Sequence, residues 1–168
     1  MKTKINTTAI VLVLFAIITT TIQAQEYDEI KKLLYSALDS VPDIYGSDFG
    51  RSVSIDGNYA VVGAPQGGIK FGEVTGSAII YELDTSDSTW SEVKRIVPSD
   101  GADGDQFGYS VAISGDVAIV GAYRNDDGGS NSGSAYIFSK DEGGNNNWGE
   151  IKKITAGDAT SGDLFGNS

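Results

Sequence analysis

The 168-residue chain contains no cysteine and no histidine. Without cysteine it can form no disulfide and carry no lipid-modified N-terminal cysteine, so core packing or bound ions must hold the fold together. Without histidine it lacks Ser-His-Asp and Cys-His catalytic systems and histidine-containing zinc sites. Phosphate-loop and dinucleotide motifs are absent too, and nothing selects two of the many carboxylates as a catalytic pair. The sequence therefore predicts a protein that is not an enzyme.

Positive charge is also scarce, with 12 Lys and Arg against 23 Asp and Glu and a net charge of −11. Nucleic-acid binding requires a basic face that neutralises phosphates, and this composition offers none. Anionic membrane surfaces repel an acidic chain for the same reason. Nucleic acid and membrane are therefore excluded as expected partners.

Long apolar runs are limited to one, at residues 9–18 near the N-terminus. It follows Lys2 and Lys4 and precedes the small residue Ala24, an order typical of a secretory signal peptide. Ten residues are too few for a membrane-spanning helix, which needs about 20. We therefore expect a signal peptide at residues 1–24, a mature chain starting at Gln25, and a secreted or cell-surface protein. Export without disulfides favours a bacterial origin.

A segment of 58 residues recurs in tandem from residue 48 onward. Each copy begins with Phe-Gly, continues through an apolar run that ends in Gly-Ala, and reaches a Trp before the next copy. Large rings and glycines at fixed places are typical of core packing, so we expect a structural role for them. These residues are Phe49, Gly50, Gly63, Ala64, Pro65 and Trp90 in the first copy, Phe107, Gly108, Gly121, Ala122 and Trp148 in the second, and Phe165 and Gly166 in the third.

The repeat divides the mature chain into copies at 48–105 and 106–162 and the start of a third at 163–168. The preceding residues 25–47 form a leading segment whose beginning shares the pattern around Trp90 and Trp148, which predicts a degenerate strand. Part of that segment, 29–38, also fits an amphipathic helix. Since the third copy is only begun, we expect further repeats in cis and poor stability or self-association of the two-copy piece.

Each copy is expected to form four strands, at 51–55, 59–64, 77–83 and 90–97 in the first copy. Asp56-Gly57 and Ser114-Gly115 predict tight hairpin turns between the first two strands. The near-continuous apolar run at 59–64 is typical of a strand covered on both faces. Tandem four-stranded units indicate an all-β fold, a partial β-propeller of antiparallel four-stranded blades, with a β-sandwich as the alternative.

Phe49-Gly50 with Gly63-Ala64-Pro65, and Phe107-Gly108 with Gly121-Ala122, resemble the Phe-Gly and Gly-Ala-Pro elements of FG-GAP repeats. Such repeats form the β-propeller of integrin α chains and occur in secreted bacterial proteins. The resemblance implies extracellular binding or adhesion, with a protein or glycan as ligand. The alternative is an accessory domain of a larger secreted hydrolase, and a catalytic domain encoded downstream would favour it.

Integrin-like repeats often place a calcium loop between their first two strands, but here that link is only a tight turn. Two residues cannot surround an ion that takes 6–8 oxygen ligands, so the family's metal site does not carry over and no cofactor is expected. The acidic loops elsewhere are the best alternative calcium site, and they equally fit solvated turns. The candidate ligands are Asp103, Asp105, Asp126 and Asp127.

Overall fold

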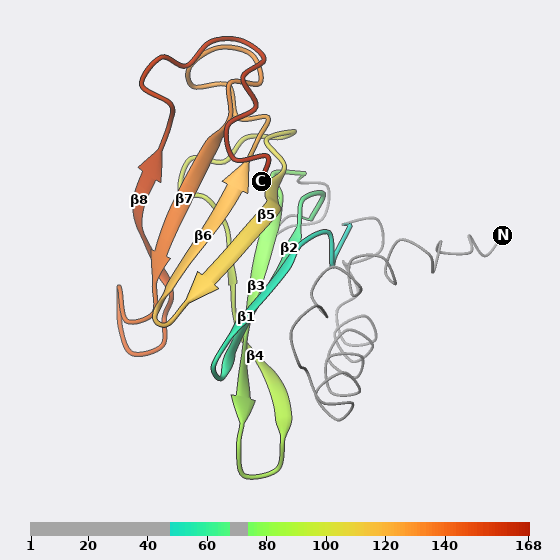
Figure 1. Ribbon diagram of the computed structural model, residues 1–168, viewed down its shortest axis with the longest axis vertical. Coiled ribbons are helices and arrows are strands. Elements are labelled where there is room, and N and C mark those ends of the chain that lie inside the picture. Colours follow the sequence, from blue (N-terminus) through green and yellow to red (C-terminus); the bar gives the residue numbers. More distant parts are fainter. Residues whose placement is uncertain (1–47, 68–73) are drawn as a thin grey trace, which may run out of the picture.

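The computed structural model describes residues 48–67 and 74–168, which form two four-stranded antiparallel sheets (Figure 1). The first sheet contains β1 (Val53–Asp56), β2 (Tyr59–Ala64), β3 (Ser77–Asp84) and β4 (Thr89–Ile96). The second contains β5 (Phe107–Ser114), β6 (Val117–Ala122), β7 (Ser134–Ser139) and β8 (Gly149–Ile154). The expected signal peptide and leading segment lie outside the described residues.

Strands follow one another in chain order within each sheet, which confirms the prediction of four-stranded antiparallel blades. A β-sandwich of the immunoglobulin kind connects strands by Greek-key crossings between its two sheets, whereas here each copy completes its own sheet. The second strand of each copy, at 59–64 and 117–122, has the predicted bounds. The fold is a partial β-propeller.

The hairpin turns differ by one residue from the prediction. Asp56 pairs with Tyr59 and Ser114 with Val117, so the turn residues are Gly57-Asn58 and Gly115-Asp116. Both glycines have positive φ, 56° and 55°. This places glycine first in a two-residue turn, the position where type II′ hairpins require it.

Some strand starts also differ from the prediction. The first strand begins at Val53 because Phe49 and Gly50 lie in a turn closed by the Arg51 amide and the Asp48 carbonyl. The repeat predicts a strand that starts at Trp148, at the position of Trp90 in the first copy. Trp148 instead lies just before β8, with a φ of 49°. Its left-handed backbone turns the indole towards the first sheet.

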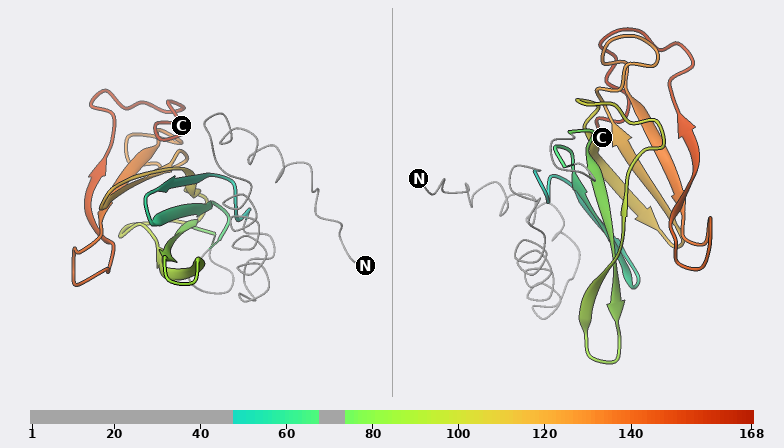
Figure 2. Two further views of the ribbon diagram at one scale, coloured as in Figure 1. Left: turned by 60° about the horizontal axis from the view of Figure 1, so that its bottom comes forward. Right: turned by 180° about the vertical axis from the view of Figure 1, so that it is seen from behind.

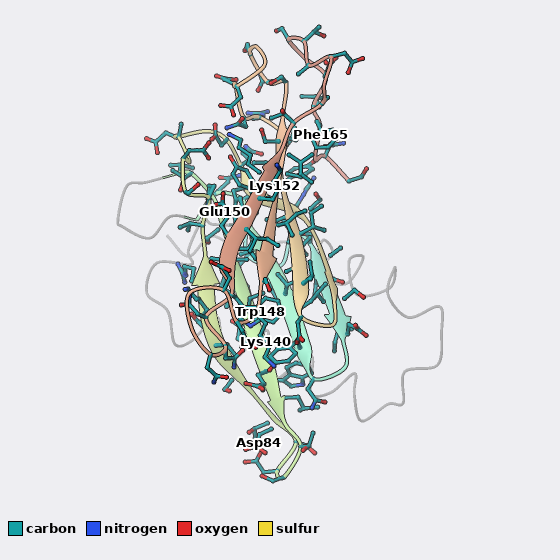
Figure 3. All side chains as sticks on the ribbon, turned by 90° about the vertical axis from the view of Figure 1, so that its left-hand side faces the viewer. Asp84, Lys140, Trp148, Glu150, Lys152 and Phe165 are labelled. Carbon is teal, nitrogen blue, oxygen red and sulfur yellow. The ribbon has the colours of Figure 1, made fainter. Side chains whose placement is uncertain are left out.

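The two sheets have a loop end and a hairpin end. At the loop end lie residues 65–67 and 74–76, the connections 97–106 and 123–133, and the segment 155–168. The tight hairpins occupy the hairpin end (Figure 2). Trp148 and Lys140 lie towards the hairpin end, whereas Phe165 lies at the loop end (Figure 3). This arrangement gathers the Phe-Gly pairs and the acidic loops at one end of the molecule.

One apolar core fills the space between the sheets. Val61 and Ile80 from the first sheet meet Phe107 and Tyr136 from the second. The Phe107 ring is 0% exposed, and its centroid lies 5.4 Å from Tyr136 and 5.8 Å from Phe138 in edge-to-face contacts. Aromatic pairs favour this geometry over face-to-face stacking. Phe107 thus occupies the centre of the blade junction.

The Phe-Gly pair of one copy docks on the Gly-Ala of the copy before it. A Cβ on Gly63 would lie 2.0 Å from the Gly108 carbonyl oxygen, which also accepts a hydrogen bond from Ser52 Oγ at 3.0 Å. The next junction repeats this contact: a Cβ on Gly121 would lie 2.0 Å from the Gly166 carbonyl oxygen. Glycine therefore recurs in the motif because the backbones of adjacent copies touch there.

Candidate functional site at the loop end

The four carboxylates predicted as calcium ligands lie on two loops of the loop end. Asp103 and Asp105 are on the 97–106 connection between the sheets, and Asp126 and Asp127 are on the 123–133 connection. Asp103 Oδ1 accepts the Val74 amide at 3.2 Å, and Asp126 Oδ1 accepts the Asn131 amide at 2.7 Å. Asp126 therefore closes a turn within its own loop. Asp103 instead ties the 97–106 connection to Val74, which lies just before β3.

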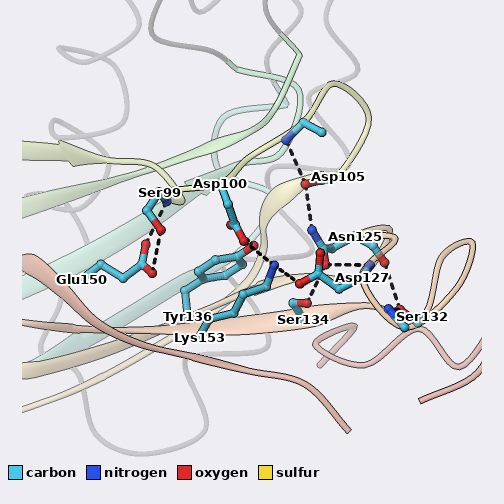
Figure 4. A network of polar contacts seen from close by, with 12 residues as sticks. Ser99, Asp100, Asp105, Asn125, Asp127, Ser132, Ser134, Tyr136, Glu150 and Lys153 are labelled. Atoms are coloured by element: carbon cyan, nitrogen blue, oxygen red, sulfur yellow. Dashed lines mark hydrogen bonds and ion pairs between the residues drawn. The ribbon is translucent and has the colours of Figure 1, made fainter.

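Asp105 lies at the centre of a buried polar network (Figure 4). It is only 4% exposed, and its Oδ2 accepts hydrogen bonds from the Ala102 amide and from Asn125 Nδ2, both at 3.0 Å. Asn125 Oδ1 in turn accepts the Ser134 hydroxyl at 2.7 Å. Burial of a carboxylate costs free energy unless the carboxylate is hydrogen-bonded. Here the hydrogen bonds link the 97–106 connection, through Asn125, to β7.

Asp127 belongs to a second network around Lys153 on β8. The ammonium forms ion pairs with Asp127 and with Asp100, whose Oδ2 lies 2.6 Å away, and it also lies over the ring of Tyr136. Tyr136 donates its hydroxyl proton to Asp100 Oδ1 at 2.8 Å (Figure 4). These four connected side chains therefore hold the 97–106 connection against the second sheet.

These contacts shift two pKa values in opposite directions. Partial burial by itself raises the pKa of Asp100, but hydrogen bonds from Lys153 and Tyr136 outweigh it, so the net pKa lies below the ordinary value. Burial by itself lowers the pKa of Lys153, and its bonds to Asp100, Asp127 and Tyr136 raise it above the ordinary value. Both shifts favour the ionised pair.

We expect Asp100→Asn to reduce the dependence of stability on acid. The folded-state pKa of Asp100 lies below its unfolded value of roughly 3.9, so its ionised form stabilises the fold above that pH. This contribution is lost as the pH falls through the folded-state pKa. Because the pair is partly exposed, its loss at pH 7 should cost less than about 1 kcal/mol. Thermal melts between pH 7 and pH 3 measure the slope, with exposed Asp158→Asn as the control; equal slopes for the variant and wild type would contradict the assignment.

No three Asp or Glu side chains gather to hold a metal ion within residues 48–67 and 74–168. Asp103, Asp105, Asp126 and Asp127 each bond a different partner, and their four carboxylates do not converge. The calcium site stays a prediction, and this arrangement does not favour it because calcium takes several oxygens in one shell.

A ladder of two arginines and two tyrosines lies at the same end, and sequence reasoning missed it. Arg51 donates to the Tyr109 hydroxyl, and its Cζ lies 4.2 Å from the centre of that ring. Tyr109 lies 4.2 Å from the Tyr123 ring, and Arg124 Cζ lies 5.3 Å from the centre of Tyr123. We call these four residues the Arg–Tyr ladder.

A sequence signal for this ladder exists in the repeat spacing. Arg51 and Tyr109 are 58 residues apart, so they hold the same position in consecutive copies, directly after Phe-Gly. Equivalent residues of adjacent blades lie side by side at their junction. A comparison of residues that differ between the copies, rather than of those that match, would have placed these two together.

Consecutive four-stranded antiparallel sheets, joined through Phe-Gly and Gly-Ala contacts, define a repeat protein of the β-propeller class. A family model described as FG-GAP repeat matches residues 45–81 and 90–138, and the chain belongs to this family. No curated protein matches the chain. The described residues include no helix that is long and apolar enough to cross a membrane.

Proposed function

We propose that the chain is an extracellular, non-catalytic binding module whose loop end contacts a protein or glycan. The observation that carries this proposal is that recurring and variable residues of the repeat have different roles at the loop end. Residues that recur in the repeat are used in packing, whereas exposed residues beside them differ between copies. Loops carried on a rigid scaffold are where binding residues concentrate in proteins.

Rigid support of the loops favours binding over a passive spacer. The Asp105–Asn125–Ser134 bonds and the Asp100–Tyr136–Lys153 contacts fix two connections of the loop end. Side chains on such loops keep their geometry before a ligand arrives, which lowers the entropy cost of binding. Secretion through the signal peptide at 1–24 would bring this surface outside the cell.

Two measurements test the proposed function. Expression with the native leader in a bacterium should deliver the chain to the medium or cell surface, beginning at Gln25 by N-terminal mass analysis. The exported chain should then bind at least one member of an immobilised panel of extracellular polysaccharides and matrix proteins, without cleaving it. Retention of Met1 on exported material would contradict the processing, and hydrolysis of a panel member would contradict the non-catalytic role.

Exposed apolar side chains on the outer face of the second sheet favour a further partner, namely another sheet of the same repeat. Val117, Ile119 and Ile151 are 44%, 39% and 49% exposed on this sheet. The equivalent of Ile119 in the first sheet is Val61, which is fully buried against the second sheet. We propose that a further four-stranded sheet covers Ile119 as the second sheet covers Val61.

We expect the 168-residue chain to self-associate through this uncovered face. Ile119→Lys should shift the chain towards monomer in light scattering and change the melting temperature little, because Ile119 is already partly exposed. Asn145→Lys adds the same charge on an exposed loop and should leave association unchanged. A wild-type chain that stays monomeric with a sharp cooperative melt would contradict the proposal of a missing neighbour.

A further inference from the structure

We propose that the Arg–Tyr ladder binds the anionic groups of an acidic polysaccharide, either carboxylates or sulfate esters on sugar rings. The inference rests on the proposed function and names the ligand class and the residues for it. The ladder consists of Arg51, Tyr109, Tyr123 and Arg124, with a guanidinium at each end of a pair of tyrosine rings.

The stacked arrangement suits anion recognition by arginine. A guanidinium that lies over an aromatic ring keeps planar N–H donors at its edge, where they match the two oxygens of a carboxylate or sulfate. Arg51 uses one of its five donors for the Tyr109 hydroxyl, and the others can bind an anion. Stacking also restricts a long side chain before the ligand arrives. Arg51 and Arg124 are exposed, and Tyr109 and Tyr123 are half-buried, so the ladder is anchored in the protein and open to solvent.

The two guanidinium groups of the ladder are not neutralised by a carboxylate of the described residues. The chain carries a net charge of −11, which repels anionic polymers from most of its surface. Lys153 is neutralised by Asp100 and Asp127, and Lys140 lies 3.7 Å from Asp116. Across residues 48–67 and 74–168, no carboxylate forms an ion pair with Arg51 or Arg124. The two guanidinium groups of the ladder therefore keep their charge available to an anion.

The repeat shows that folding does not require these residue types. The position after Phe-Gly holds Arg51, Tyr109 and Asn167 in the three copies. The position after Gly-Ala holds Pro65 in the first copy and Tyr123 in the second, and the next position holds Gln66 and then Arg124. Positions whose residue type varies between copies are not constrained by packing of the repeat, so their side chains can be selected for ligand binding.

A polysaccharide fits this surface better than a single small anion does. A polymer with an anionic group on successive sugars can engage both guanidinium groups at once, and the second contact gains from effective concentration. Tyrosine offers an apolar ring and a polar hydroxyl, which suits a sugar with C–H faces and hydroxyl edges. Acidic peptides are the competing ligand class, and the experiment separates the two.

The experiment measures binding of the exported chain to immobilised polygalacturonate and dextran sulfate at low salt, with neutral dextran and poly-glutamate alongside. The wild type should bind one of the two acidic polysaccharides and not dextran. Arg124→Gln and Arg51→Gln should each weaken this binding at least about tenfold, since each removes hydrogen bonds to a charged group. Arg124→Lys keeps the charge and loses the planar fork, so it should bind less tightly than wild type.

Lys152→Gln is the matched control. It removes one positive charge from exposed Lys152 on β8, three strands from β5, and should change affinity less than twofold (Figure 3). Thermal melts of each variant should match wild type, because the arginine heads lie on the surface.

Each of the following results would overturn the inference. Arg51→Gln and Arg124→Gln could bind the polysaccharide as wild type does, or Lys152→Gln could weaken binding equally, which would show diffuse attraction. Binding of poly-glutamate with neither polysaccharide would assign the ladder to acidic proteins. A chain that binds another member of the extracellular panel and neither acidic polysaccharide refutes this inference alone. A chain that binds nothing on the panel refutes the proposed function as well.

Discussion

Phe107→Ala should lower the free energy of unfolding by about 3–5 kcal/mol, as truncation of a buried phenylalanine does in other cores. Phe107 is fully buried at the centre of the junction and touches the rings of Tyr136 and Phe138. Its removal leaves a cavity between two sheets that have no disulfide to hold them together. Urea unfolding followed by tryptophan fluorescence measures the loss, since Trp148 lies in the same core.

Phe165→Ala is a matched control within the same chain. Phe165 holds the same repeat position and forms the equivalent bridge, to Gly133 as Phe107 does to Gly76, but it is 36% exposed. Its truncation should cost less than about 1 kcal/mol, the scale of changes away from a packed core. Equal costs for the two variants would show that the motif phenylalanine acts locally and not through the junction between sheets.

The repeat spacing predicted the four-stranded blade, but it did not predict how deeply each motif residue is buried. Phe49 and Phe107 hold the same position in the repeat, yet Phe49 is half-buried and Phe107 completely buried. Trp90 and Trp148 differ in the same way, because Trp148 packs edge-on against Tyr59 of the preceding sheet at 5.4 Å. Burial depends on the neighbouring copy, and periodicity within one copy carries no information about it.

The acidic loops show a second limit of sequence reasoning. Their place in the loops made Asp105 and Asp127 candidate metal ligands. The sequence could not reveal that Asp105 accepts a hydrogen bond from Asn125, or that Asp127 forms an ion pair with Lys153. Both partners come from other elements, 20 and 26 residues away along the chain. Carboxylates near glycines satisfy a turn and a metal site equally well in sequence, and only their three-dimensional partners separate the two.

The recurrent glycines were identified from the sequence, but their purpose needed the structure. A structural role was expected for the glycine of Phe-Gly, and the structure shows that its backbone contacts the glycine of Gly-Ala in the preceding copy. The contact joins Gly63 to Gly108, 45 residues apart, through backbone atoms alone. Two motif elements that appear separate in the sequence therefore form one joint between blades.

Gly63→Ala should disrupt this joint and cost about 3 kcal/mol, at the upper end of the range for overpacking. Gly63 has an ordinary backbone conformation, so the penalty does not come from φ. It comes from a methyl group placed 2.0 Å from the Gly108 carbonyl oxygen and 2.4 Å from Ser52 Oγ. The sheets must separate locally to admit it, which also weakens the bond from Ser52 to Gly108.

Gly157→Ala provides the control, because a Cβ there meets nothing within 4 Å and the backbone again has no positive φ. This change should alter stability by no more than about 0.5 kcal/mol. Urea unfolding of both variants gives the comparison, and Ser52→Ala isolates the share due to the hydrogen bond, about 1 kcal/mol. If Gly63→Ala were as mild as Gly157→Ala, the sheets would yield at their closest contact, and the joint would not explain why glycine recurs at this position of the repeat.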